Sequence, residues 1–165
     1  MYTAQLPNMG PFSIRYPRGR GVTAEWKTKM EKIIPGTGRR IKKGKKTAVL
    51  TIGAIGNQVK EADEKLLQEG IDISHYDMRF VKPLDVKLLH EIFSEYDHII
   101  TVEDGVLHGG FGSAVTEFMA DNEYVKKIKR LGIPDTFVEH GTQSELYHLH
   151  EYDSDAIYKT IKSLY

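Results

Sequence analysis

The chain has 165 residues, of which 40% are hydrophobic and 28% charged, the composition of an ordinary globular protein of one domain. Its 23 Lys and Arg balance 23 Asp and Glu, so the formal net charge is zero. This balance argues against a domain that mainly neutralises nucleic acid or an anionic membrane surface. The absence of cysteine excludes disulfides, thiolate nucleophiles and Cys-ligated zinc.

Two further patterns bear on location. No apolar stretch approaches the roughly 18–20 residues that span a bilayer, and the N-terminus lacks the basic-then-apolar pattern of a signal peptide. We therefore expect a cytoplasmic protein without a membrane partner.

The first 46 residues contain few regular elements. Residues 12–16 are typical of a single strand, and residues 22–38 read as a loop with a Pro-Gly-Thr-Gly linker at its end. Residues 39–46 then place six basic residues in eight. Such a run is either a phosphate or nucleic-acid patch or a solvated hairpin that turns at Gly44 into the first core strand. The neutral chain favours the hairpin.

From Thr47 onward, short β-rich runs alternate with apolar residues at helical spacing. The runs predict strands at Thr47–Gly53, Ile71–Asp77, His98–Glu103, Lys127–Leu131 and Phe137–Glu139. The helical spacing predicts helices near Val59–Leu67, Leu84–Phe93, Gly109–Asp121, Gln143–His150 and Ser154–Leu164. Alternation with short connections implies right-handed crossovers. We therefore predict a three-layer α/β/α fold around a mainly parallel, five-stranded sheet.

A glycine-rich run, residues 105–113, lies between a predicted strand and a predicted helix. It is not a dinucleotide fingerprint, because position 115 is Val, and not a P-loop, because no lysine precedes Ser113. Gly109 and Gly110 let a helix N-terminus approach either an anion or a neighbouring element closely, and both interpretations stay open. His108 in this run is a proton-transfer candidate by residue type or a plain surface histidine.

Glu103 and Asp104 are adjacent carboxylates at the carboxyl end of a predicted strand, where open α/β sheets place ligand sites. A hydrolytic or metal role needs further acidic or histidine partners, and the sequence shows none nearby. The seven histidines are scattered without metal-ligand spacing, and no Gly-x-Ser-x-Gly elbow is present. The chain therefore contains no self-contained catalytic constellation.

Two arginines are placed like ligand-binding groups. Arg15 lies inside the apolar run 12–17, and Arg79 follows a predicted strand. An arginine at the carboxyl end of a strand can form a bidentate clamp on phosphate or carboxylate. The alternative is a structural ion pair, which for Arg79 would involve Asp77 or Asp85, and residue type alone does not separate the two.

Four motifs, at residues 14–19, 77–85, 101–113 and 131–143, occur in this order. Together they resemble the C-terminal part of the 1-deoxy-D-xylulose-5-phosphate synthases, a family of transketolase-like enzymes that depend on thiamine diphosphate. The two middle motifs are also similar to those of 2-oxoacid dehydrogenase beta subunits, which gives a second hypothesis. The Arg-Tyr-Pro-Arg-Gly and Pro-Asp-x-Phe-Val-Glu-His-Gly elements favour the synthases.

The resemblance implies a division of the chain. Residues 1–22 would be the end of a pyrimidine-binding domain, 23–46 a connector, and 47–165 the transketolase C-terminal-like domain. The family's metal motif, Gly-Asp-Gly followed by Asn, is missing, and the glutamate that activates thiamine would lie upstream of Met1. We therefore expect no catalytic, cofactor-binding or metal residue in this chain, and no catalysis by it alone. Met1 opens onto Tyr2 with no sign that a domain begins, which fits a piece of a longer protein.

The resemblance also implies an activity for the whole enzyme, a homodimer that requires thiamine diphosphate and Mg²⁺. It would condense pyruvate with D-glyceraldehyde 3-phosphate, with loss of CO₂, for isoprenoid, thiamine and pyridoxal precursors. The family holds the phosphate of the acceptor with two arginines, and Arg15 and Arg79 match their positions. A non-enzymatic binding module that uses residues 39–46 is the third hypothesis.

Overall fold

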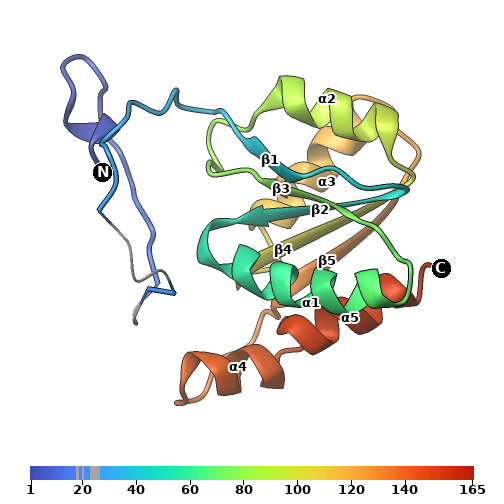
Figure 1. Ribbon diagram of the computed structural model, residues 1–165. Helices are drawn as coiled ribbons and strands as arrows, with labels where there is room; N and C mark the ends of the chain where they lie inside the picture. Colours follow the sequence, from blue (N-terminus) through green and yellow to red (C-terminus); the bar gives the residue numbers. More distant parts are fainter. Residues whose placement is uncertain (18, 20, 23–26) are drawn as a thin grey trace.

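The fold is a five-stranded sheet between two layers of helices (Figure 1). The computed structural model describes residues 1–17, 19, 21–22 and 27–165. Their strands are β1 (Arg39–Lys42), β2 (Thr47–Ile52), β3 (Ser74–Asp77), β4 (His98–Val106) and β5 (Lys127–Ile133). Their helices are α1 (Gly56–Gln68), α2 (Val86–Glu95), α3 (Phe111–Asp121), α4 (Gln143–Leu149) and α5 (Ser154–Lys162), with 3-10 turns at Thr3–Gln5 and Gly53–Ile55.

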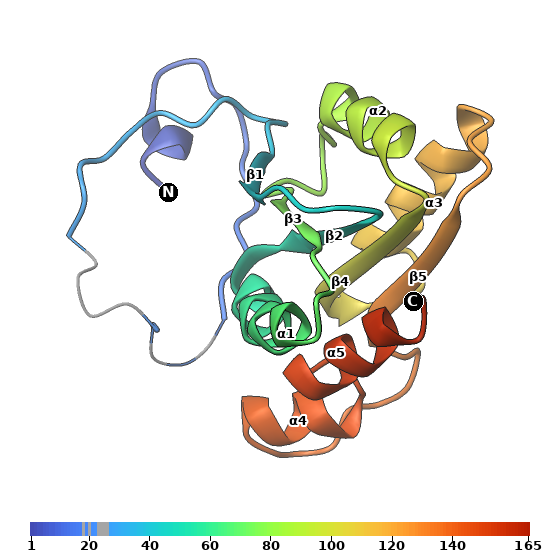
Figure 2. The ribbon, with the colours of Figure 1, turned by 45° about the vertical axis from the view of Figure 1, so that its right-hand side comes forward.

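The sheet has the order β1-β3-β2-β4-β5. Four of its strands are parallel, and only the edge strand β1 is antiparallel to its neighbour. The central strand β2 is buried at its first five positions, as a strand covered on both faces should be. Helices α1 and α5 pack on one face, and α2 and α3 on the other (Figure 2). The predicted three-layer α/β/α fold is confirmed.

The fifth strand is not the one that we expected. Residues 137–139 form no strand, and Phe137 is fully exposed. The fifth strand is β1, from the basic run that we interpreted as a solvated hairpin. Phe137 and Val138 have high β-propensity, but both are exposed, and β-propensity favours a strand only where one face of it is buried.

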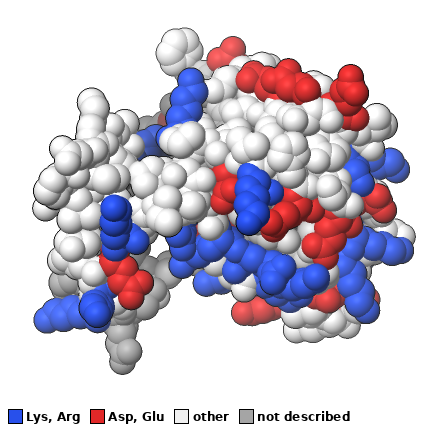
Figure 3. All heavy atoms as spheres, turned by 90° about the horizontal axis from the view of Figure 1, so that it is seen from above, with Lys and Arg blue, Asp and Glu red and all other residues white. Residues whose placement is uncertain are grey.

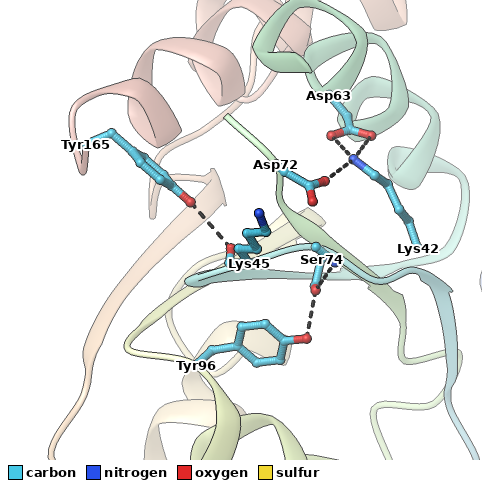
Figure 4. Close-up of polar contacts among 8 residues, drawn as sticks. Lys42, Lys45, Asp63, Asp72, Ser74, Tyr96 and Tyr165 are labelled. Carbon is cyan, nitrogen blue, oxygen red and sulfur yellow. Dashed lines mark hydrogen bonds and ion pairs between the residues drawn. The ribbon is translucent and has the colours of Figure 1, made fainter. Parts of the chain in front are cut away.

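The predicted hairpin at Gly44 is also wrong in its pairing, because β3 lies between β1 and β2. The chain crosses directly over Ile73: a Cβ on Gly44 would lie 2.3 Å from the carbonyl carbon of Ile73. The nitrogen of Gly44 donates to Ser74 Oγ at 2.7 Å, and Ser74 in turn donates to Tyr96 (Figure 4). A glycine is therefore required where the connection passes over the next strand.

Half of the basic residues in the run 39–46 form ion pairs with neighbouring carboxylates. Arg39 pairs with Asp77, Lys43 pairs with Glu95, and Lys42 bridges two aspartates (Figure 4). On the face drawn in Figure 3, acidic side chains border the basic ones. This arrangement supports the interpretation of a solvated face over that of a nucleic-acid patch.

Of the described residues before β1, the N-terminal part lies to one side of the sheet and has no regular structure apart from the 3-10 turn at Thr3–Gln5 (Figures 1 and 2). The strand predicted at residues 12–16 is absent, since these residues have no regular structure. The segment is held by Thr3, whose Oγ1 accepts the N–H of Ile33 at 2.9 Å. The expected start of the connector, residues 23–26, lies outside the described residues. No helix of the described chain is long and apolar enough to cross a membrane.

Candidate functional site

The carboxyl edge of the sheet is the place where the topology allows a ligand site. Strands β2 to β5 are parallel, so their carboxyl ends meet at this edge. From β2 the chain goes to β3 on one side and then to β4 on the other. Ligands of open α/β sheets bind at such a switch in strand order, here between the ends of β2 and β4.

Glu103, at the end of β4, is buried and anchors helix α3. Its two carboxylate oxygens accept the N–H groups of Phe111 and Gly112, each at 2.8 Å. These are unpaired donors of the first helical turn, where a negative charge is favourable. A Cβ on Gly110 would lie 2.1 Å from the oxygen of Val106, so only glycine fits. The glycine run thus packs the helix onto a carboxylate of the protein itself, and the interpretation as an anion site loses its support.

The end of β4 is a bulge. Val102 faces Leu131 and Val106 faces Ile133, so residues 103–105 of β4 stand opposite Gly132 alone. A Cβ on Gly132 would lie 2.9 Å from the oxygen of Gly105, which explains the glycine at this position. Bulges re-aim backbone and side chains beside active sites, and this one leaves Asp104 outside the regular register with β5.

Asp104 is the centre of a hydrogen-bond cluster. Its carboxylate accepts the hydroxyl of Tyr147 at 3.1 Å and that of Tyr152 at 3.2 Å. Burial, and then the charge of Asp104, raise the pKa of Tyr147 to about 12 and that of Tyr152 further. Both hydroxyls therefore stay protonated and act as donors at neutral pH.

Arg15 reaches the same cluster from the N-terminal segment. Its Nη2 donates to the backbone oxygen of Asp104 at 2.8 Å. A Cβ on Gly105 would lie 3.3 Å from Nη1 of Arg15, and one on Gly19 would lie 2.9 Å from Oε1 of Gln143. The segment around Arg15 therefore lies between the end of β4 and the start of α4. Arg18 of the same motif is outside the described residues.

Arg79 follows β3 at the same edge, half-buried and with a φ of 56°. Its N–H donates to Asp77 at 3.2 Å, but the charged partners that we considered for it are engaged elsewhere. Asp77 pairs with Arg39, and Asp85 caps α2 by accepting the N–H of Leu88. Within the described residues no carboxylate pairs with the guanidinium of Arg79, so the ion-pair interpretation loses its partners.

The two arginines lie at one edge of the sheet without touching. Arg79 follows β3, Arg15 is held at the end of β4, and β2 separates these strands. The ends of these two strands lie two strand spacings, or about 10 Å, apart.

His108 is exposed, and the described residues give it no hydrogen-bond partner. The loop that carries His108 is held by Arg130 of β5. Its Nη1 donates to the oxygen of Leu107 and to Ser113 Oγ, both at 2.9 Å. This geometry supports a structural role for the loop over a chemical one for His108.

The described residues contain no group of three or more His, Asp or Glu side chains that could hold a metal ion. The helix N-terminus that a diphosphate would use is occupied by Glu103. The described residues at this edge therefore do not fit thiamine diphosphate or Mg²⁺.

The sequence did not point to Tyr147, Tyr152 or Arg130. The tyrosines lie 43 and 48 residues from Asp104 along the chain, and no periodic pattern reports so distant a contact. The sequence does show where α4 begins, because Thr142 and Glu145 have the spacing of a capping box. This spacing places Tyr147 on a helix but does not indicate its contact with Asp104.

The profile of the family "Transketolase, C-terminal domain" matches residues 36–157, and the chain belongs to this family. Three proteins named 1-deoxy-D-xylulose-5-phosphate synthase are similar to it. That of Phocaeicola vulgatus is 56% identical over 99% of this chain and 26% of its own length. That of Cytophaga hutchinsonii is 55% identical over 99% and 26%, and that of Geobacillus sp. is 42% identical over 88% and 23%.

The chain thus resembles the C-terminal part of these synthases and spans about a quarter of their length. Among solved structures, a protein described as "Split gene transketolase, inactive beta4 tetramer" matches with a TM-score of 0.74 and 28% identity. The match covers 81% of this chain and 43% of that one. Fold and family agree with the resemblance inferred from the motifs.

Proposed function

We propose that this chain is the C-terminal region of a 1-deoxy-D-xylulose-5-phosphate synthase and that it seats the phosphate of the acceptor substrate. The whole protein would join pyruvate to D-glyceraldehyde 3-phosphate with loss of CO₂. The product named by the relatives carries a phosphate, so the enzyme must hold a phosphorylated molecule. The observation that carries the proposal is the guanidinium of Arg79, without a carboxylate partner among the described residues, at the edge that also holds Arg15.

The two arginines would act by orientation. A phosphate held by charge-assisted, bidentate bonds is fixed at one end of a short molecule, so the aldehyde carbon at the other end points in one direction. Positioning of this kind supplies a large part of a bimolecular reaction's acceleration. Each hydrogen bond to the charged group contributes about 1.5–3 kcal/mol.

The remaining parts of the machinery belong to the rest of the protein in this proposal. Thiamine diphosphate and Mg²⁺ would be bound outside this chain, and the chain alone would be inactive. Residues 1–22, 23–46 and 47–165 would be the end of the preceding domain, the connector and the C-terminal domain. Strand β1 comes from the connector, so the connector would complete the sheet. A homodimer in the cytoplasm stays a prediction from the family resemblance.

No specific observation favours the 2-oxoacid dehydrogenase beta subunit or the non-enzymatic binding module. The relatives reported above carry the name of the synthase and not that of a 2-oxoacid dehydrogenase beta subunit. The basic run of a nucleic-acid module is neutralised in part by carboxylates, as in the pairs Arg39–Asp77 and Lys43–Glu95.

The test is the substitution Arg79→Ala in the full-length protein. Losing one charge-assisted contact should raise the KM for D-glyceraldehyde 3-phosphate roughly 10- to 150-fold, with a much smaller change in the KM for pyruvate. The control is Lys127→Ala, because Lys127 is exposed and begins β5 at the opposite edge of the sheet. Equal effects of Arg79→Ala on both substrates would overturn the proposal.

A further inference from the structure

The guanidinium of Arg15 is exposed and comes from a segment without regular structure. No ladder or helix fixes it, and the hydrogen bond that the structure gives it runs to the backbone oxygen of Asp104. The direction of the Arg15 guanidinium therefore depends on the direction of the carbonyl that accepts its hydrogen bond. The position of the Asp104 carbonyl therefore matters for any anion that Arg15 binds.

This carbonyl lies in the bulge of β4, where strand pairing does not determine its direction. Residues 103–105 stand opposite the single residue Gly132, outside the regular register. What fixes the bulge is its two carboxylates, which point to different sides. Glu103 holds the N-terminus of α3, and Asp104 accepts the two tyrosine hydroxyls from the α4 side of the sheet.

The tyrosines are themselves well anchored. Tyr152 is 1% exposed and belongs to the core, and the rings of Tyr147 and Tyr152 pack with centroids 4.9 Å apart. The N–H of Tyr152 donates to the oxygen of Tyr147 at 3.0 Å. Each oxygen of the Asp104 carboxylate thus accepts a hydrogen bond from an anchored tyrosine, and rotation of the carboxylate would break both bonds.

Helix α4 also brings the Arg15 segment and the tyrosines together. Its first residue, Gln143, lies against Gly19, and the capping box at Thr142 fixes where the helix begins. The two motifs that favoured the synthases in the sequence, one around Arg15 and one before α4, therefore meet in space.

From this geometry we propose that Asp104 is a positioning residue for the phosphate seat. Tyr147 and Tyr152 hold its carboxylate, the carboxylate fixes the bulge, and the bulge aims the carbonyl that orients Arg15. The inference rests on the proposed role of Arg15 in phosphate binding. Neither Asp104 nor the tyrosines need to touch the substrate.

The experiment removes the two hydroxyls in the full-length protein by the double substitution Tyr147→Phe and Tyr152→Phe. We expect the KM for D-glyceraldehyde 3-phosphate to rise about tenfold, since small misplacements of a binding group cost this much or more. The inhibition constant of inorganic phosphate, measured in competition with the same substrate, should rise in parallel, while the KM for pyruvate should change by less than about twofold. The control is Tyr158→Phe, which removes a tyrosine hydroxyl of α5 that donates to Glu69 at the C-terminal end of α1.

The decisive comparison repeats the double substitution in an Arg15→Ala background. If the tyrosines act through Arg15, they should cause no further rise in the KM for D-glyceraldehyde 3-phosphate there. A full additional rise in the Arg15→Ala background, or no rise in the native background, overturns the positioning role but leaves the phosphate seat intact. If Arg15→Ala alone leaves that KM unchanged, the proposed function of Arg15 fails, and the inference fails with it.

Discussion

Glu103→Gln is the substitution whose effect the structure defines best. The side chain is 4% exposed, and its oxygens accept two backbone N–H groups at 2.8 Å. Glutamine keeps one acceptor oxygen and turns a donor toward the other N–H. One buried donor then loses its partner, and the helix N-terminus loses a negative charge. The first effect costs about 1–3 kcal/mol and the second about 0.3–1 kcal/mol.

We therefore expect Glu103→Gln to lower the free energy of unfolding by about 1.3–4 kcal/mol, and Glu103→Ala by more, because alanine leaves both N–H groups unpaired. The assay is urea unfolding of the 165-residue chain, followed by far-UV circular dichroism, with the slope m compared between variants. The control is Glu117→Gln, an exposed position on the same helix, where less than about 0.5 kcal/mol is expected. A loss for Glu103→Gln no larger than that of the control would refute the capping role.

Three further substitutions test other parts of the fold. Gly110→Ala would place a Cβ 2.1 Å from the oxygen of Val106, so we expect a loss above about 3 kcal/mol, measured by the same urea unfolding; a loss near 1 kcal/mol would contradict the close packing. Burial lowers the pKa of His75, partly opposed by Asp77, to about 4, so between pH 6.5 and 4 the unfolded chain binds the proton more readily. Stability should thus fall by about 3 kcal/mol as the pH falls through this window, and His75→Gln should remove that part of the pH dependence. Lys42→Ala leaves two aspartates facing each other without their cation and should cost about 1–3 kcal/mol at low salt, with a smaller loss in 1 M NaCl.

The alternation of strands and helices from Thr47 to Asp121 was predictable because the strands are short buried runs and the helices bury one side in a regular period. Val59, Ala62 and Leu66 recur at helical spacing on α1, and all three are buried against the sheet. A periodic pattern of this kind reports which face is covered, whatever covers it. The carboxyl edge, and with it the place of Glu103 and Arg79, follows from parallel pairing alone.

The sequence predicted some residues of the candidate site but not which groups they contact. Residue type and position marked Arg15, Arg79 and Asp104, but their partners lie far away in the sequence: Arg15 contacts a residue 89 positions later. Whether an arginine pairs with a carboxylate or keeps its charge for a ligand depends on which carboxylates other residues have already engaged. For Arg79 this was decided by Arg39, which takes Asp77, and by the helix cap at Asp85.

Length, composition and periodicity thus determined by themselves that a neutral chain of 165 residues forms a three-layer α/β fold, since local burial repeats along each element. Only the tertiary structure decided that the basic run supplies β1, that Glu103 closes the helix N-terminus, and that Tyr147 and Tyr152 hold Asp104. The physical reason is the same in each case. Edge pairing, capping by a distant carboxylate and hydrogen bonds across the sheet join residues that the chain brings together only when the core has formed.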